Sequence, residues 1–221
     1  YQLKILNDEE TKLGIERSSL SENMLKTILN EYSIADKIVV PSTYTYQSFL
    51  DYGIDKDKLY LTGLIGKKNQ YSGKLKNIVQ SDNLKVGLIG NGVVRKGYYH
   101  AFEALMKLEN IEVVIKCSRK EISNYSAVYE QLKLLESSNV KVTILDYLED
   151  ISDFYYNIDM LLLPSVDEGF GMVVHEALAF GVIPIVSEHV GAKDILCQGV
   201  DGFILPVGNS MSIYNLISNL I

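Results

Sequence analysis

One short segment, PSVDEGFGMVVHEALAFG (164–181), combines two glutamates with several glycines. Its residue types and spacing are the clearest candidates for chemistry in this sequence. Glu168 lies in a glycine-flanked loop, and Glu176 follows among apolar residues whose spacing predicts a helix. Glycines let a ligand approach the backbone closely, and a helix start offers unpaired N–H groups to an anion. A partly buried Glu176 needs a polar partner, such as ligand hydroxyls, a Lys or Arg side chain, or a backbone N–H. A surface glutamate beside an acidic turn is the simpler alternative.

A second loop, GLIGNGVVRKG (87–97), could hold a phosphate. Gly90 and Gly92 follow an apolar run, and Arg95 and Lys96 add two positive charges just before a predicted helix. The spacing fits neither the dinucleotide-binding fingerprint nor a Walker A loop. A phosphate-bearing ligand and a structural turn with a solvated Lys-Arg pair are therefore both open at this point.

The elements that must position these loops alternate in type from residue 84 to residue 221. Continuous apolar runs predict strands buried on both faces, and their alternation with helices predicts a doubly wound α/β fold with a parallel sheet. Ligands of such folds bind at the carboxyl ends of the strands, where both loops would lie. The predicted strands are 37–42, 57–63, 84–90, 112–118, 140–146, 159–165, 182–187 and 201–207, and the predicted helices are 16–35, 43–53, 98–108, 126–137, 151–158, 170–180 and 210–221.

The first third of the chain predicts a partial second α/β domain. We expect residues 1–66 to form it, a polar and Lys-rich stretch at 67–83 to be a linker, and 84–221 to form the ligand-binding domain. The chain starts without Met and stops inside a predicted helix, so we expect a fragment of a two-domain protein.

Composition excludes several function classes. The 221 residues are 47% hydrophobic, as in an ordinary globular protein, and no apolar run or signal peptide indicates a membrane span or secretion. The net charge of −7 argues against nucleic acid as a partner. Cys117 and Cys197 show no zinc or disulfide spacing, which is typical of free thiols in the cytoplasm.

The order of these motifs resembles GT-B retaining glycosyltransferases of family four, the glycosyl transferases group 1. The most specific part is the paired-glutamate frame, PSVDEGFGMVVHEALAFGVIPIVSEHVGAKDIL (164–196). Residues 35–63 resemble the close of that family's acceptor-binding domain, and 90–105 resemble its diphosphate loop. Residues 142–165 resemble its base-binding segment, and 199–209 a later strand. The resemblance implies a GT-B fold in which 84–221 bind the donor.

The resemblance also implies roles for single residues. Lys96, helped by Arg95, would neutralise the donor diphosphate, and Glu168 would contact sugar hydroxyls beside the reacting carbon. Glu176 would accept hydrogen bonds from the ribose hydroxyls. Further donor contacts are implied for the first loop (Gly90, Asn91, Gly92), for residues against the base (Tyr147, Leu148) and for backbone facing the sugar and phosphates (Gly169, Phe170, Gly171, Met172, Val173).

The implied function is retaining transfer of a sugar from a UDP-, GDP- or ADP-sugar to a glycan or lipid-linked acceptor, in polysaccharide biosynthesis. No cofactor or metal is expected, because lysine, arginine and a helix dipole supply the positive charge. We expect a cytoplasmic protein that meets the inner face of the membrane through a missing acceptor-side part. This chain alone should bind the donor and transfer nothing.

Three positions depart from the family pattern, and two alternative functions stand beside the implied one. Asn91 stands where the family often has Arg, Asp194 where it usually has Glu, and LIGKKN (64–69) where it usually shows a Gly-x-Asp turn. A glycosyltransferase-like subunit without catalysis is one alternative function. A GT-B nucleotide-sugar epimerase is the other.

Overall fold

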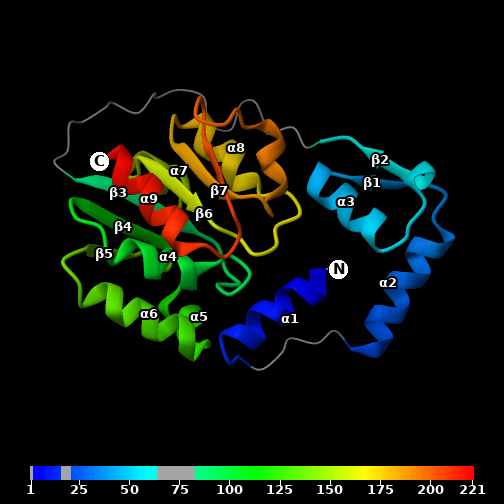
Figure 1. Ribbon diagram of the computed structural model, residues 1–221, viewed down its shortest axis with the longest axis horizontal. Helices are drawn as coiled ribbons and strands as arrows, with labels where there is room; N and C mark the ends of the chain where they lie inside the picture. The colour runs from blue at the N-terminus through cyan, green and yellow to red at the C-terminus, as the bar shows by residue number, and fades with distance from the viewer. Residues whose placement is uncertain (1, 16–20, 64–82) are drawn as a thin grey trace.

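The computed structural model describes residues 2–15, 21–63 and 83–221. Within these ranges six parallel strands form the main sheet, in the order β5-β4-β3-β6-β7-β8 (Figure 1). This arrangement confirms the predicted doubly wound α/β fold. The strands are β3 (Leu84–Ile89), β4 (Ile111–Lys116), β5 (Lys141–Ile144), β6 (Met160–Leu163), β7 (Ile183–Ser187) and β8 (Phe203–Leu205).

Helices cover both faces of this sheet, which explains why its strands are apolar without alternation. Val86 and Leu88 of β3 belong to a core with α4, α6 and α9, while Ile89 belongs to a second core with α7 and α8. Gly87 leaves room for Ile158, which follows α7 on that second face. The helices are α4 (Tyr98–Leu105), α5 (Arg119–Ser123), α6 (Ser126–Glu136), α7 (Ser152–Tyr156), α8 (Met172–Ala179) and α9 (Ser210–Leu220).

The strand order reverses at β3. From β3 the chain proceeds outward through β4 to β5, and then returns to the other side of β3 with β6, β7 and β8. The loops that leave β3 and β6 are therefore neighbours at the carboxyl edge of the sheet. A reversal of this kind is where doubly wound folds bind their ligands.

Most of the N-terminal elements stand beside the main sheet, at the right of Figure 1, and α1 lies between them and α5. Strand β1 pairs in parallel with β2, and α3 packs against both. The predicted helix 16–35 begins at Glu22, where the Ser21 hydroxyl accepts the Met24 N–H at 3.2 Å; residues 16–20 lie outside the described ranges. The elements are α1 (Gln2–Lys12), α2 (Glu22–Ile34), β1 (Ile38–Val40), α3 (Thr43–Asp51), η1 (Lys56–Lys58) and β2 (Leu59–Leu61).

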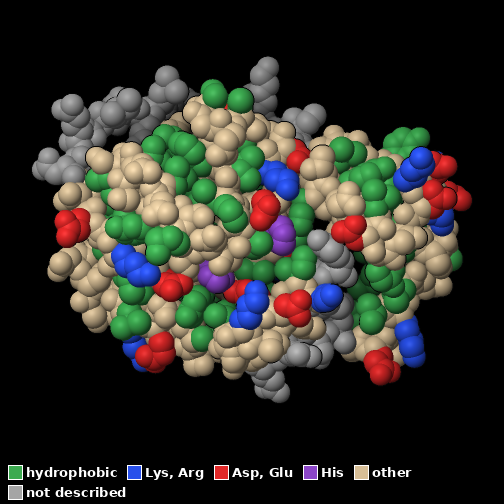
Figure 2. Space-filling view, viewed as in Figure 1, with side chains coloured by type: hydrophobic (Ala, Val, Ile, Leu, Met, Phe, Trp, Pro, Cys, Tyr) green, Lys and Arg blue, Asp and Glu red, His purple; other side chains and the backbone are tan. Residues whose placement is uncertain are grey.

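Charged side chains of both signs are interspersed on the face shown in Figure 2, which carries no broad positive patch. None of the helices in the described part of the chain is long and apolar enough to cross a bilayer. The predicted linker, 67–83, falls outside the described residues except for Asn83. The domain division at 66 and 84 therefore stays a prediction.

Candidate functional site

The loop after β3 is shaped by glycines in left-handed conformations. Gly90, Gly92 and Gly97 have φ angles of 116°, 73° and 71°, which side chains with a Cβ rarely adopt. Gly97 forms the N-terminal boundary of α4, and its α-carbon lies against the backbone of Pro164 at the end of β6. The turn therefore brings the residues before Gly97 next to the second loop.

Lys96 and Glu168 form an ion pair across the two loops. The Lys96 Nζ donates to Glu168 Oε2 at 2.5 Å, and the two side chains are only 10% and 13% exposed. Arg95 Nη1 lies 3.4 Å from the same oxygen and 3.3 Å from the Asp167 carbonyl oxygen, with its side chain 39% exposed. The structure thus gathers the three residues that the sequence singled out for chemistry, with two cations around one carboxylate.

Backbone hydrogen bonds hold the Glu168 loop in place. The Val166 N–H donates to the Arg95 carbonyl at 2.8 Å and so joins the loops directly. The Glu168 N–H donates to the His189 carbonyl at 3.1 Å, and the Glu168 carbonyl accepts the Gly191 N–H at 2.9 Å. Both the N–H and the carbonyl of Glu168 are therefore hydrogen-bonded to residues 189–191, as in a parallel sheet.

Helix α8 begins at Met172, after Gly171 with a φ of 94°, as the sequence predicted for this loop-to-helix turn. Glu176, one turn into this helix, accepts a hydrogen bond from the Tyr155 hydroxyl at 2.5 Å. The sequence predicted a polar partner for Glu176 but not that this partner is Tyr155. That residue belongs to α7, and an apolar helix pattern accounted for it without a polar role.

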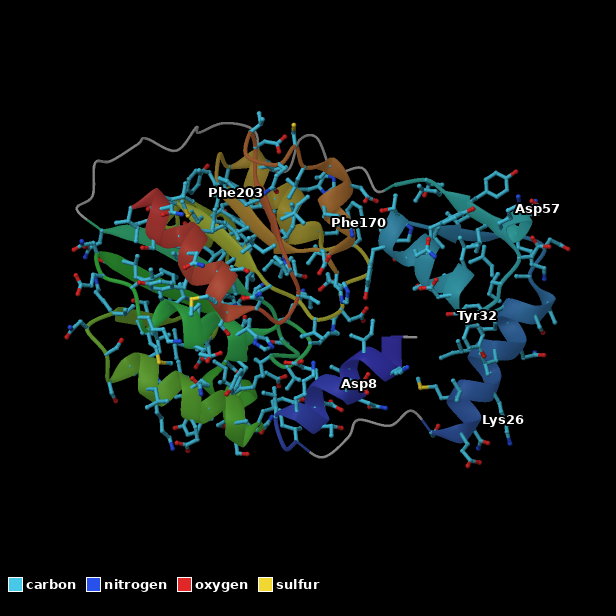
Figure 3. All side chains as sticks on the ribbon, viewed as in Figure 1. Asp8, Lys26, Tyr32, Asp57, Phe170 and Phe203 are labelled. Carbon is cyan, nitrogen blue, oxygen red and sulfur yellow. The ribbon has the colours of Figure 1, made fainter. Side chains whose placement is uncertain are left out.

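The start of α3 is bonded to the Glu168 loop and to the turn η2 (Gly191–Ile195). The hydroxyls of Ser42 and Thr45 donate to the Gly169 carbonyl at 2.6 and 2.8 Å. The Thr43 N–H and hydroxyl donate to the two Asp194 oxygens at 2.6 and 2.5 Å. Phe170, the next residue of the loop, lies on the side of the sheet that faces α3 (Figure 3). Asp194 thus binds the first residue of α3, whose N-cap is Ser42.

Asp167, beside Glu168, is a buried carboxyl at the same junction. Burial raises the pKa of Asp167, although the Tyr44 hydroxyl, which donates to it at 2.8 Å, and the nearby Arg95 charge act in the opposite direction. The Tyr44 ring also stacks on His189, with ring centroids 5.2 Å apart. The loop that carries Glu168 is thereby packed between the main sheet and α3.

A family model for glycosyl transferases group 1 matches residues 72–221, which include every part of this site except the α3 contacts. The chain belongs to this family. Capsular polysaccharide biosynthesis glycosyltransferase CapM of Staphylococcus aureus is 28% identical over 145 residues, which are 64% of this chain and 37% of CapM. The matched part of the chain thus spans well under half the length of this relative.

Solved structures show the same fold at low identity. Anabaena HepE in complex with UDP and glucose has a TM-score of 0.69 at 20% identity, over 90% of this chain and 57% of HepE. Sucrose-phosphate synthase of Thermosynechococcus elongatus has a TM-score of 0.74 at 18% identity, over 97% and 56%. The fold of this group 1 chain is therefore of the GT-B type.

The other predicted donor contacts of this group 1 chain lie around the same edge of the sheet. Tyr147 is 79% exposed after β5, and Leu148 packs at the margin of the second core. Asn91 is exposed, and its side-chain oxygen lies 3.7 Å from the Cys117 sulfur at the end of β4. The Gly92 N–H donates to Glu121 of α5 at 3.1 Å, a contact that sequence reasoning missed.

The two cysteines should differ sharply in reactivity. Burial raises the pKa of Cys117 to about 11, so its thiolate is scarce at neutral pH, whereas Cys197 is exposed. With iodoacetamide at pH about 8, we expect Cys197 to be alkylated at least about 100-fold faster than Cys117. Peptide mass spectrometry at timed intervals measures both rates. Equal rates in the folded protein would contradict the burial of Cys117.

In the described ranges, no group of three or more His, Cys, Asp or Glu residues is arranged to hold a metal ion. Lys96 and Arg95 are the two cations that pair with Glu168. Both lie at the point where the strand order reverses.

Proposed function

We propose that this chain binds a nucleoside diphosphate-sugar and acts within a retaining glycosyltransferase of family four. The observation that carries the proposal is the Lys96–Glu168 pair, with Arg95 beside it, at the reversal of strand order. Membership of the group 1 family gives the reaction class. The likeness to HepE, solved with UDP and glucose, supports a nucleotide-sugar donor.

In this proposal the two cations receive the diphosphate. The Lys96 ammonium has three N–H donors, so it can keep Glu168 and still donate to a phosphate oxygen. The Arg95 guanidinium offers a second, more exposed set of donors. Both charges would stabilise the nucleotide as it departs, which is where negative charge develops. Glu168 would then face hydroxyls of the sugar.

We further propose that transfer retains the configuration at the reacting carbon. The bond from that carbon to the diphosphate oxygen breaks, and the acceptor oxygen forms its bond on the same face. The acceptor proton passes to the departing phosphate, so charge and atoms balance. A glycan or lipid-linked hydroxyl at the cytoplasmic side of a membrane is the proposed acceptor. The biosynthetic context is supported by CapM, a capsular polysaccharide glycosyltransferase.

Calorimetric titration of the chain with UDP, GDP and ADP, each with and without glucose attached, tests donor binding. We expect one base to bind with a Kd between about 1 μM and 1 mM, and the matching monophosphate at least about tenfold more weakly. Adding EDTA should leave the Kd unchanged, since lysine and arginine supply the charge. Absence of binding by all three nucleotides at millimolar concentration would favour the non-catalytic subunit instead.

A further inference from the structure

The Tyr155 hydroxyl is buried in the second core and has Glu176 as its partner. Tyr155 is fully buried, and a buried phenol requires a hydrogen-bond partner. That partner is Glu176 Oε2, at 2.5 Å. A hydrogen bond to a carboxylate is stronger than one between neutral groups. The bond therefore fixes one of the two carboxylate oxygens.

The Tyr155 ring has little freedom to move. It stacks on Phe180 with centroids 5.2 Å apart and an interplanar angle of 11°, and Phe154 meets it edge-on at 5.2 Å. Phe180 closes α8 four residues after Glu176, so ring and carboxylate are held by the same helix. The hydroxyl position is consequently set by packing that does not involve Glu176 itself.

A glutamate carboxylate otherwise rotates freely about its last torsion, which is broad. With Oε2 held by Tyr155, Oε1 is left in one orientation as an acceptor. We propose that Tyr155 is a positioning residue that orients Glu176 toward the ribose hydroxyls, and that it thereby sets the preference for ribonucleotides over deoxyribonucleotides. The inference rests on the proposed function, in which Glu176 binds ribose. It adds Tyr155, for which the sequence predicted only a place in the helix 151–158.

The test compares a ribonucleoside diphosphate with its 2′-deoxy form, using the one of UDP, GDP or ADP that the unmodified chain binds most tightly. The unmodified chain should prefer the ribose form about tenfold, the worth of one good hydrogen bond. Tyr155→Phe keeps the ring and removes the hydroxyl, so this preference should fall to about twofold. Affinity for the deoxy form should change less than about twofold.

Tyr156→Phe is the matched control. Tyr156 meets the same Phe180 ring edge-on, with centroids 5.0 Å apart, and its variant should keep the full ribose preference. Thermal melts should show all three proteins folded. A ribose preference that survives Tyr155→Phe, or that is absent from the unmodified chain, overturns the inference while nucleotide binding stands. Absence of nucleotide binding by the unmodified chain overturns the proposed function together with the inference.

Discussion

Replacing Lys96 with alanine is expected to weaken binding of a nucleoside diphosphate about 100-fold and binding of the free nucleoside less than about threefold. The variant removes the less exposed of the two cations and leaves the negative charge of Glu168, which lies close by, without its 2.5 Å partner. The loss therefore combines a missing charge-assisted hydrogen bond with new repulsion. Calorimetric titration of both ligands measures the two effects, and a melt reports how far the fold is destabilised.

Lys120→Ala is the matched control for the lost charge. Lys120 lies exposed on α5, where solvent and salt screen its charge, so diphosphate affinity should change less than about twofold. Arg95→Ala should fall between the two variants, since its side chain is 39% exposed. Equal losses for nucleoside and diphosphate in Lys96→Ala would count against a diphosphate role. An equally large effect of Lys120→Ala would show only a general dependence on charge.

The sheet could be predicted from the sequence because its strands are buried on both faces. A run such as LKVGLI has no polar alternation when helices cover each side, and continuous apolar runs of this length indicate parallel strands. Helix α1 was not predicted, because its sequence is largely polar and its stability depends on contacts far along the chain. Its buried Glu9 lies 2.5 Å from His100 Nε2, a partner that no local pattern reveals.

The site could be predicted only as far as its loops. Sequence placed Lys96 and Glu168 at the ends of two strands, but their ion pair joins positions 72 residues apart. The bond from Thr43 to Asp194 spans 151 residues and depends on how α3 meets η2. Such contacts follow from packing rather than from periodicity. The hydrogen bond from Tyr155 to Glu176 could not be predicted for the same reason, because an apolar helix pattern accounts for a tyrosine without any polar partner.

Gly97→Ala is expected to lower the free energy of unfolding by about 3–5 kcal/mol, through two costs that act together. Gly97 has a φ of 71°, and an alanine held there costs about 1–2 kcal/mol. An added Cβ would also overlap the Pro164 carbonyl oxygen and approach the Pro164 carbonyl carbon to 2.9 Å. Backbone cannot rotate away as a side chain can, so the turn and the end of β6 must separate.

Gly181→Ala isolates the second cost. Gly181 has the same φ of 71°, but an added Cβ there meets nothing within 4 Å, so only the backbone strain of about 1–2 kcal/mol applies. Urea unfolding of both variants, analysed with one m-value, gives the difference between their free energies of unfolding. Separating the Gly97 turn from the end of β6 should also weaken diphosphate binding, and only in Gly97→Ala. Gly97 follows Lys96 directly, and Pro164 begins the loop that carries Glu168. Equal destabilisation by the two variants would mean that the two loops are not held together at Gly97.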